Sequence, residues 1–439
     1  MKVLKFGGTS VGSAQRMKDV AKLIADGEQK IVVLSAMSGT TNTLVEISDY
    51  LYKKNPEGAN EIINRLESKY KQHIDELYDT EAYKQKTREF VKSVFDYIRS
   101  FTKDIFTLFE EKVILAQGEI ISTNMVTNYL CEQGIKAYLI PALEFMRTDK
   151  NSEPDLNYIR EKLNAQLEAH PGQDIYITQG FICRNAYGEI DNLQRGGSDY
   201  TASLIGAAIH ASEIQIWTDI DGMHDNDPRI VDKTSPVRQL HFEEAAELAY
   251  FGAKILHPTC VQPAKYANIP VRLLNTMEPS APGTLISNDT EKGKIKAVAA
   301  KDNITAIKIK SSRMLLAHGF LRKVFEIFES YQTAIDMVCT SEVGVSMSID
   351  NTKHLNEIVN DLKKYGTVTV DHDMCIVCVV GDLEWENVGF EAKALDAMRD
   401  IPVRMISYGG SNYNISFLIR ECDKKKALQS LSDLLFNGK

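Results

Sequence analysis

The sequence predicts an α/β protein. An open, mainly parallel sheet with helices on both faces comes first, and two smaller ferredoxin-like βαββαβ units follow. The first fifty residues alternate strand, helix and strand, as parallel strands joined by a crossover helix do. The last third of the chain contains an internal repeat with an offset of seventy residues. The chain has 439 residues, which is enough for two or three domains.

The amino-terminal half supplies the elements of the parallel sheet. Residues 2–6 and 31–34 form short apolar runs, and Met17, Val20, Ala21 and Ile24 recur between them at helical spacing. Residues 43–132 have a mainly helical pattern and are expected to form an insertion beside the sheet. Later elements are predicted as strands at 174–178, 213–218 and 271–275, a hairpin at 180–194 and an Ala-rich helix at 199–211.

The carboxyl-terminal repeat predicts two units. Residues 304–370 follow the order strand, helix, two strands, helix, strand, and residues 374–437 follow the same order without the last strand. Gly319-Phe320 and Gly389-Phe390 open corresponding helices. A spare strand-like segment at 296–300 precedes the first unit. We expect it to complete the second unit, so that the two units interleave.

The polar, turn-rich stretch at 286–294 predicts a domain boundary. The expected domains are therefore a first domain at 1–286 and a second region at 295–439. Within the second region, the first unit covers about 304–371, and the second covers about 374–439 together with the strand 295–301.

Composition excludes several classes of protein. The chain is 44% hydrophobic and 25% charged, with a formal net charge of −9. This acidity argues against binding to nucleic acid or to acidic membrane surfaces. No long apolar stretch predicts a leader or a membrane span. The seven scattered cysteines are typical of reduced thiols, so we expect a cytoplasmic protein.

Cys375 and Cys378 form a C-x-x-C pair, which is half of many zinc or redox sites. They lie in the continuous apolar run 374–380, and no second pair lies nearby. The pattern therefore favours a buried strand over a metal or redox site at this pair, and the sequence assigns no metal ligands with certainty.

The segment Lys5-Phe6-Gly7-Gly8-Thr9 places a basic residue at a strand end before two glycines. Glycines let backbone N–H groups approach a phosphate closely, and a following helix adds its dipole. A Gly-Gly turn alone is equally compatible with a simple tight turn. The sequence Arg195-Gly196-Gly197-Ser198-Asp199 repeats the pattern at the start of the predicted helix. Arg195 can grip a carboxylate, while Asp199 can be a helix cap or can hold Lys5 or a metal ion.

Two further polar sets follow strands. The acidic loop at 217–222 continues to Asp227-Pro228-Arg229, at the edge where open α/β sheets bind ligands. Its spacing does not match an EF-hand calcium loop. The loop at 35–41, rich in Ser, Gly and Thr, and Glu119 would suit a polar substrate that carries an ammonium group. Each of these residues can also be an ordinary loop residue.

Read together, these segments resemble the aspartokinases. The matching motifs are KFGGTSV at 5–11, TQGFI at 178–182, RGGSDYTA at 195–202, WTDIDG at 217–222, DPR at 227–229 and FGAKILHP at 251–258. The resemblance covers essentially the whole chain, and the repeat is similar to paired ACT domains. It implies an amino-acid kinase fold and transfer of the ATP γ-phosphoryl group to L-aspartate, which gives 4-phospho-L-aspartate for lysine, threonine, methionine and diaminopimelate synthesis.

The resemblance also implies residue roles. Lys5 and Asp199 match the catalytic pair. The aspartate-binding positions are matched by Thr41, Glu119, Arg195 and Ser198, to which Ser35 is added from its loop. The nucleotide-binding positions are matched by Lys5, Gly7, Gly8, Thr9, Thr218, Asp219, His224, Arg229 and Lys254. His224 departs from the pattern, since many members carry tyrosine there.

The chemistry agrees with these roles. The nucleophile is a carboxylate with an ordinary pKa of about 3.9, so no general base is needed and Asp199 is expected to orient. An anion must nevertheless attack a polyanion. Lys5, glycine-turn N–H groups and Mg²⁺ that accompanies ATP would offset the repulsion.

The lysine-sensitive members imply an effector site in the first ACT unit. Its aligned positions are Met314, Ala317, Phe320, Leu321, Asp336, Ser341 and Glu342. Asp336 or Glu342 could pair with a lysine ammonium, and Ala317 departs from the usual serine. For Phe320 and Leu321, packing of the helix on its sheet is an equally good explanation. Lysine is the leading effector and threonine the second, with a homodimer or homotetramer expected.

Two other functions remain open at this stage. A sister carboxylate kinase acting on glutamate shares the fold, but the paired units and RGGSDYT argue against it. A non-catalytic amino-acid sensor would not need the set Lys5, Arg195 and Asp199. An ATP-turnover assay separates these alternatives.

Overall fold

The structure is a computed structural model. It describes residues 1–103, 105–193, 196–252, 256–289, 291–311 and 318–437. Contacts divide the chain into two compact units, Met1–Met223 with Ile255–Asn288, and His224–Lys254 with Asp289–Lys439. The segment His224–Lys254 therefore packs with the carboxyl-terminal residues, although it lies inside the range expected for the first domain. The domain boundaries drawn from the sequence stay a prediction.

The first unit is built on a mainly parallel sheet. Its strands are β1 (Lys2–Phe6), β2 (Lys30–Leu34), β3 (Ala137–Leu139), β4 (Ile175–Gln179), β7 (Ile214–Thr218), β9 (Val271–Asn275) and β10 (Thr284–Ser287). Within this unit they lie in the order β3-β4-β2-β1-β7-β9-β10. All these pairings are parallel except that of β10 with β9. The chain passes from β1 to β2 on one side and from β7 to β9 on the other, so the connections change direction between β1 and β7.

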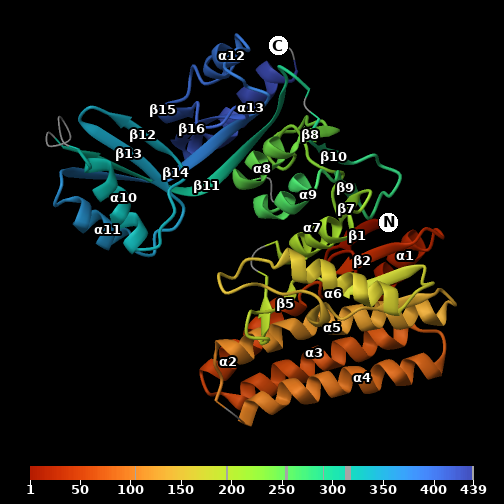
Figure 1. Ribbon diagram of the computed structural model, residues 1–439. Helices are drawn as coiled ribbons and strands as arrows, with labels where there is room; N and C mark the ends of the chain where they lie inside the picture. Colours follow the sequence, from red (N-terminus) through yellow and green to blue (C-terminus); the bar gives the residue numbers. More distant parts are fainter. Residues whose placement is uncertain (104, 194–195, 253–255, 290, 312–317, 438–439) are drawn as a thin grey trace. The chain divides into compact units, whose positions relative to one another are not determined.

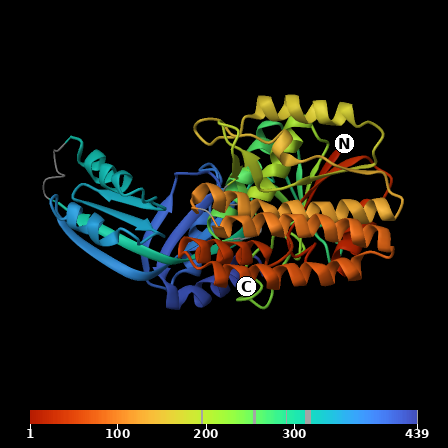
Figure 2. The ribbon, with the colours of Figure 1, turned by 90° about the horizontal axis from the view of Figure 1, so that it is seen from below.

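Helices cover both faces of this sheet. They are α1 (Ala14–Ile24), α2 (Thr40–Tyr52), α3 (Pro56–Leu77), α4 (Glu81–Ser100), α5 (Leu108–Glu132), α6 (Leu156–Ala169), α7 (Gly197–Ile209) and α9 (Gln262–Tyr266). The predicted helical insertion is confirmed as α2 to α5, which lie side by side in Figure 1. Figure 2 shows α6 (yellow) on the side of the unit opposite to these orange helices. A short hairpin, β5 (Ile182–Arg184) and β6 (Ile190–Asn192), follows β4.

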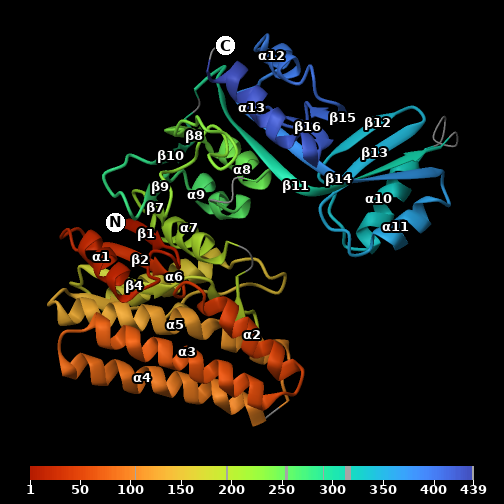
Figure 3. The same ribbon diagram turned by 180° about the vertical axis from the view of Figure 1, so that it is seen from behind.

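The central strands are buried on both faces. Leu4 and Phe6 of β1 join Leu34 of β2 in a core that α1, α3, α4 and α5 complete. Val3 and Val33, whose side chains point to the other face, are also 0% exposed. Burial on both faces is the rule for parallel sheets, and it explains why these strands are short continuous apolar runs in the sequence. Figure 3 shows α1, β2 and β4 of this unit from behind.

The second unit contains a six-stranded antiparallel sheet in the order β12-β13-β11-β14-β16-β15. Its strands are β11 (Ile295–Lys310), β12 (Val338–Ser341), β13 (Gly344–Ile349), β14 (Thr367–Gly381), β15 (Val403–Tyr408) and β16 (Asn414–Arg420). Its helices are α10 (Phe320–Ser330), α11 (Leu355–Leu362), α12 (Phe390–Ala397) and α13 (Lys424–Leu435). The segment His224–Lys254 adds β8 (Gln239–His241) and α8 (Phe242–Tyr250).

The two long central strands are shared between two βαββαβ modules. The second half of β11 pairs with β13 and with the first half of β14. The first half of β11 pairs with the second half of β14, where Val298 lies opposite Val379. The register shifts between Lys301 and Ile304, and Asn303 there has φ of 59°. The first module is therefore continuous in the chain, whereas the second module is completed by the first half of β11, which precedes the first module in the sequence.

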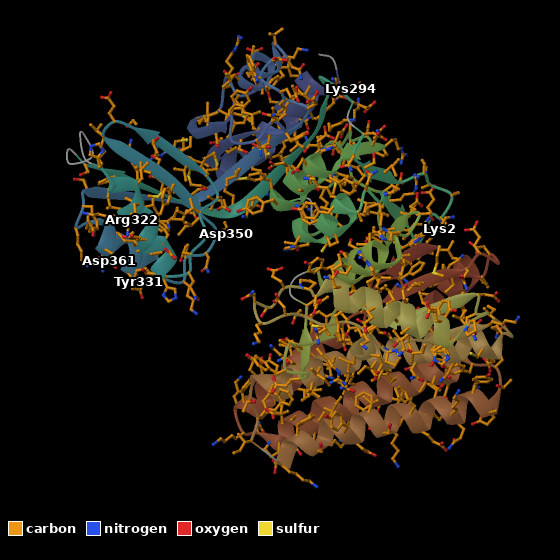
Figure 4. The ribbon with its side chains drawn as sticks, viewed as in Figure 1. Lys2, Lys294, Arg322, Tyr331, Asp350 and Asp361 are labelled. Carbon is orange, nitrogen blue, oxygen red and sulfur yellow. The ribbon has the colours of Figure 1, made fainter. Side chains whose placement is uncertain are left out.

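Each module has its own core. Val324, Phe328 and Met347 belong to the core of the first module, and Phe390, Phe417 and Leu431 to that of the second. On the first module, Tyr331 at the end of α10 donates a hydrogen bond of 2.9 Å to Asp361 of α11, and Figure 4 labels both.

The cysteine pair lies where the apolar run predicted it. Cys375 and Cys378 are buried in β14, and both are free thiols. Burial raises the pKa of both thiols. Among the described residues, no helix has the length and apolar composition that a membrane span needs.

Candidate active site

The glycine turn after β1 is in contact with the loop after β2. Ser38 donates a backbone hydrogen bond of 3.1 Å to the Gly8 carbonyl. A Cβ added at Gly8 would lie 2.8 Å from the Ala36 carbonyl oxygen, which is too close for any side chain. Gly8 is therefore required for this approach of the two loops, which both follow the carboxyl ends of adjacent parallel strands.

Lys5 and Asp199 form an ion pair beside this turn. Lys5 Nζ, near the end of β1, lies 2.6 Å from Asp199 Oδ1 in the first turn of α7, and each side chain is 13% exposed. The helix begins at Gly197, so Asp199 is its third residue rather than its cap. A Cβ at Gly7 would lie 3.7 Å from Lys5 Nζ, an ordinary contact distance, so this residue of the glycine turn lies directly beside the ammonium.

The start of α7 is fixed by a left-handed glycine. Gly196 has φ of 76°, and an added Cβ would lie 2.6 Å from both Cys260 Sγ and His257 Cβ. Among the described residues, no side chain caps this helix. Its first N–H groups are thus available to an anion, and the helix dipole favours one. Burial raises the pKa of the Cys260 thiol to about 12, with Asp199 adding to the effect, so this neighbour stays a neutral thiol.

Glu119 of α5 is a buried carboxylate with one unsatisfied oxygen. The residue is 4% exposed, and Oε1 accepts a hydrogen bond of 3.2 Å from the Ala36 N–H. Glu119 Oε2 has no hydrogen-bond partner among the residues that the structure describes. Burial raises the pKa of Glu119 to about 8. A buried acceptor that lacks a donor is costly unless a ligand satisfies it, and an ammonium group is a suitable donor.

Two serines connect the loop after β2 to α7. Ser35 Oγ donates to Ser198 Oγ over 3.0 Å, and the Ser35 carbonyl accepts from Ser122 of α5 over 2.8 Å. A Cβ at Gly180, just after β4, would lie 2.5 Å from Ser198 Oγ. The carboxyl ends of β1, β2 and β4 and the first turn of α7 therefore bring Lys5, Ser35, Ser198 and Asp199 together.

Thr218 and Asp219 lie at the end of β7, the strand next to β1. Thr218 Oγ1 donates a hydrogen bond of 3.1 Å to Asp219 Oδ1. The following turn is tight, since Gly222 has φ of 74° and an added Cβ would lie 2.3 Å from Thr284 Oγ1. Because the connections change direction between β1 and β7, these residues flank the crevice where open α/β sheets bind ligands.

The remaining nucleotide positions belong to the second compact unit. His224 Nδ1 lies 3.0 Å from Thr234 Oγ1. The Arg229 guanidinium makes two hydrogen bonds to Asp227, of 2.9 and 2.7 Å, and is 76% exposed. Lys254 lies outside the described residues. The roles of these three residues toward a nucleotide stay predictions.

The effector positions are described in part. Met314 and Ala317 lie outside the described residues, as does Arg195 of the substrate set. Phe320 belongs to the core of the first module, which supports its packing role, whereas Leu321 is 37% exposed. Ser341 Oγ donates to the Gly344 carbonyl over 3.4 Å, and Glu342 is exposed.

Asp336 is already paired within the chain, which the sequence did not predict. Its Oδ1 lies 2.7 Å from Lys301 Nζ and accepts a hydrogen bond of 2.7 Å from the Tyr250 hydroxyl. Lys301 also pairs with Asp350, labelled in Figure 4, at 2.9 Å, and it lies 4.3 Å from the Tyr250 ring centroid. Although burial opposes its charge, the hydrogen bonds to Asp336 and Asp350 raise the pKa of Lys301. The Asp336 side chain is 2% exposed, and its Oδ2 has no partner among the described residues.

Sequence reasoning missed one buried polar contact at the site. The hydroxyls of Tyr70 in α3 and Thr40 in α2 lie 2.9 Å apart. A tyrosine in a helical pattern gives no signal that its hydroxyl reaches the start of another helix, thirty residues earlier in the sequence.

The chain is similar to known proteins over almost its whole length. The model of the Amino acid kinase family matches residues 1–275, and that of the ACT domain matches residues 377–435. Aspartokinase 1, chloroplastic, of Arabidopsis thaliana is 35% identical over 99% of this chain and 80% of its own length. Lysine-sensitive aspartokinase 3 of Escherichia coli is 31% identical over 99% of both chains.

Solved structures agree with these relatives. The crystal structure of Escherichia coli aspartokinase III with aspartate and ADP, in the R-state, is 31% identical, covers 99% of this chain and 100% of its own, and superposes with a TM-score of 0.86. The T-state structure with lysine and aspartate is 32% identical and covers 99% of both chains with a TM-score of 0.82. The chain therefore belongs to the aspartokinases, within the Amino acid kinase family.

Proposed function

We propose that the chain is an aspartate kinase, which transfers the γ-phosphoryl group of ATP to the β-carboxylate of L-aspartate. The observation that carries this function is the partly buried Lys5–Asp199 pair between two glycine turns at the carboxyl end of the sheet. The function also agrees with the similarity over 99% of the chain to curated aspartokinases.

The reaction needs little acid–base chemistry. A β-carboxylate oxygen attacks the γ-phosphorus, and the bond from that phosphorus to the oxygen bridging to the β-phosphate breaks, so ADP leaves with the electron pair. The attacking carboxylate is ionised at neutral pH because its ordinary pKa is about 3.9. Catalysis therefore consists of positioning and of stabilising negative charge. Lys5 supplies the positive charge, and Asp199 holds its ammonium in place.

The aspartate pocket lies beside this pair in the proposal. Glu119 Oε2 is buried and has no donor within the part of the chain that the structure describes, so it is suited to receive the α-ammonium group of aspartate. Ser35, Thr41 and Ser198 add hydroxyls, and Arg195 is assigned to the α-carboxylate. Gly7, Gly8, Thr9, Thr218 and Asp219 border the phosphate side, and His224, Arg229 and Lys254 are proposed to contact the nucleotide.

Mg²⁺ is proposed to accompany ATP. In the part of the chain that the structure describes, no group of three His, Cys, Asp or Glu side chains forms a metal cage. This fits an ion that takes most of its ligands from phosphates and water, and one or two carboxylates from the protein. Asp199 and Asp219 are the carboxylates of this edge that could serve. When bound, Mg²⁺ neutralises phosphate charge.

Lysine is the proposed inhibitor, with threonine second, and it acts by favouring one of two arrangements of kinase and ACT units. Paired ACT units are proposed to join two or four copies of the chain. The free cysteines support a reducing compartment such as the cytoplasm.

Hydroxamate trapping of acyl phosphate tests the proposal directly. The full chain is incubated with ATP, Mg²⁺ and hydroxylamine, with aspartate or glutamate as acceptor, and with or without lysine and threonine. A signal that requires aspartate and is suppressed by lysine is expected. A signal with glutamate alone would assign a sister kinase, silence with both would favour an amino-acid sensor, and an aspartate signal indifferent to lysine and threonine would overturn the regulatory part.

A further inference from the structure

Within the helical insertion, a buried hydrogen bond joins α3 to the first residue of α2. Tyr70 of α3 is 1% exposed and packs against Phe95 of α4, with ring centroids 5.9 Å apart. Its hydroxyl shares a hydrogen bond of 2.9 Å with Thr40 Oγ1, which is also buried. Two hydroxyls that are removed from water satisfy each other here, so the loss of either leaves the other unpaired.

Thr40 lies at the start of α2, directly before a residue that is proposed to bind aspartate. It is the first residue of α2, and it follows Gly39, whose φ is 82°. No side chain caps this helix among the described residues, and the Thr40 hydroxyl bond is one of the contacts that hold its first turn, beside the hydrogen bonds of Thr43 to the Gly39 carbonyl. Thr41, the next residue, is one of the proposed aspartate-binding residues. A shift of Thr40 would therefore displace the Thr41 side chain.

The loop before Thr40 is held from α5 at the same time. A Cβ at Gly118 would lie 2.8 Å from Ala36 Cβ and 3.2 Å from Thr40 Cγ2, so α5 already presses on both residues. The Ala36 N–H donates to Glu119. Tyr70 is also close enough to Glu119 for that carboxylate to raise the pKa of its phenol, after burial as the larger cause. The Tyr70–Thr40 pair and the Ala36–Glu119 pair are thus two buried hydrogen bonds that flank Gly118 of α5.

We propose that Tyr70 is a positioning residue for the aspartate pocket, and that its hydrogen bond to Thr40 holds the loop at 35–41 in the geometry that binds the substrate. The inference rests on the proposed function. It gives α3, which carries none of the residues assigned to the aspartate pocket, a role in binding the amino-acid substrate in addition to its role in the core.

The effect should fall on substrate binding rather than on the phosphoryl transfer. Tyr70 acts through Thr40 on the loop whose Ala36 N–H contacts Glu119, the residue assigned to the α-ammonium group, and that group has the same charge in the ground state and the transition state. A residue of this kind changes KM and leaves kcat. The net worth of one neutral hydrogen bond predicts a rise of about fivefold in the KM for aspartate.

The test compares two tyrosines that sit in the same insertion. Tyr70→Phe removes the hydroxyl and keeps the ring. Tyr78→Phe is the matched control, because Tyr78 is 2% exposed and donates a hydrogen bond of 2.8 Å to the Met125 carbonyl, away from the loop. Expected for Tyr70→Phe are a KM for aspartate raised about fivefold, and kcat and the KM for ATP within about twofold of wild type. Tyr78→Phe should leave all three constants unchanged.

Two further measurements make the outcome decisive. Thr40→Val should raise the KM for aspartate as Tyr70→Phe does, and the double variant should add nothing, because both remove the same bond. Amide hydrogen exchange without substrates should be faster at 36–43 in Tyr70→Phe than in Tyr78→Phe. An unchanged KM and unchanged exchange in Tyr70→Phe would overturn the inference. If amide exchange differs between the two variants as expected but the wild-type protein does not phosphorylate aspartate, the proposed function is overturned instead.

Discussion

Lys5 Nζ lies 2.6 Å from Asp199 Oδ1, and this pair joins the end of β1 to the first turn of α7. Both side chains are 13% exposed, so the pair borders the crevice rather than lying deep in the core. The carboxylate fixes the position of an ammonium that would otherwise move on a long side chain. A positive charge already oriented before the substrates meet is the arrangement that lowers the barrier for an anion attacking a phosphate.

The first prediction concerns this ammonium. Lys5→Ala should lower kcat by at least about a hundredfold, because the charge acts most strongly on the transition state. The affinity for ATP should change far less, since the glycine turn and helix N–H groups remain. Steady-state kinetics gives kcat. Titration with ATP, followed by the quenching of the fluorescence of Trp217 on the adjacent strand, gives the affinity.

Lys2→Ala is the matched control. Lys2 lies on the same strand but pairs with Glu28 at the surface, at 2.9 Å and 39% exposure. It should leave both constants unchanged. If Lys5→Ala weakened ATP binding and left kcat intact, the catalytic role of Lys5 would be wrong.

The second prediction concerns the pH dependence of aspartate binding. Burial raises the pKa of Glu119 to about 8, so the empty site holds a neutral carboxyl group at pH 7. The α-ammonium group of aspartate needs the carboxylate. The KM for aspartate should therefore fall as pH rises from 6 to 8, by about tenfold per pH unit if Glu119 alone titrates. In Glu119→Gln the KM should be high and nearly independent of pH, while the KM for ATP serves as the internal control.

The same pKa shift makes a prediction about stability. The folded protein binds the Glu119 proton more tightly than the unfolded chain does. The free energy of unfolding should therefore fall as pH rises from the unfolded value of about 4.5 to the folded value of about 8, and this contribution should be constant above that. Urea unfolding of wild type and Glu119→Gln at pH 5 and pH 8.5 measures it. A wild type that lost no stability relative to Glu119→Gln over this range would contradict the raised pKa.

Much of the fold was predictable because the strands are short apolar runs buried on both faces. Residues 2–6 and 271–275 are strands as expected. The strand expected at 31–34 begins one residue earlier, at Lys30. The strands β3 and β10 were missed, since segments of three or four half-buried residues carry little periodicity. The start of α7 was placed two residues late, because Gly197 reads as a turn residue until its neighbours are known.

The site was predictable where local chemistry carries a signal. Glycine turns and the family pattern identified Lys5, Ser198 and Asp199, which the structure brings together. The contacts of Tyr70 and Lys301 were not predictable, because each depends on packing between segments distant in the sequence. Lys301 reaches Asp336 beside an irregularity of β11, and the sequence shows no sign of that register shift.

The third prediction concerns Gly118 in α5. An alanine in a helix is ordinarily about 1 kcal/mol more favourable than glycine. Here its Cβ would lie 2.8 Å from Ala36 Cβ, so Gly118→Ala should instead destabilise the protein by about 1–3 kcal/mol and raise the KM for aspartate. Urea unfolding and steady-state kinetics measure both. At Gly410 an added Cβ meets nothing within 4 Å, so Gly410→Ala is the neutral control. A stabilised, fully active Gly118→Ala would show that α5 does not press on the loop.

The fourth prediction concerns the ion pair of Lys301 with Asp336. If an inhibitory amino acid places its ammonium on Asp336, it must compete with Lys301, whose Nζ lies 2.7 Å away. Lys301→Met should then lower the lysine concentration needed for half inhibition, because the competitor is gone. Asp336→Asn should raise that concentration, because the charge is gone. Asp350→Asn, which removes the outer partner of Lys301, should have a smaller effect. Equal sensitivity in Lys301→Met and wild type would exclude competition at Asp336.

The fifth prediction concerns the two long strands of the carboxyl-terminal unit. The pairing of Ile295–Lys301 is made with the second half of β14, and Ala297 and Val298 are buried there. A chain that ends at residue 372 keeps every element of the first module but loses the partner of this segment. It should be poorly soluble and should be cleaved rapidly by protease within 289–301, because an apolar edge strand is left open. A chain that ends at residue 437 should behave like the full-length protein. A soluble chain ending at 372 with protected amides at 295–301 would mean that the first module folds without the second, and that the shared strands are not required for either.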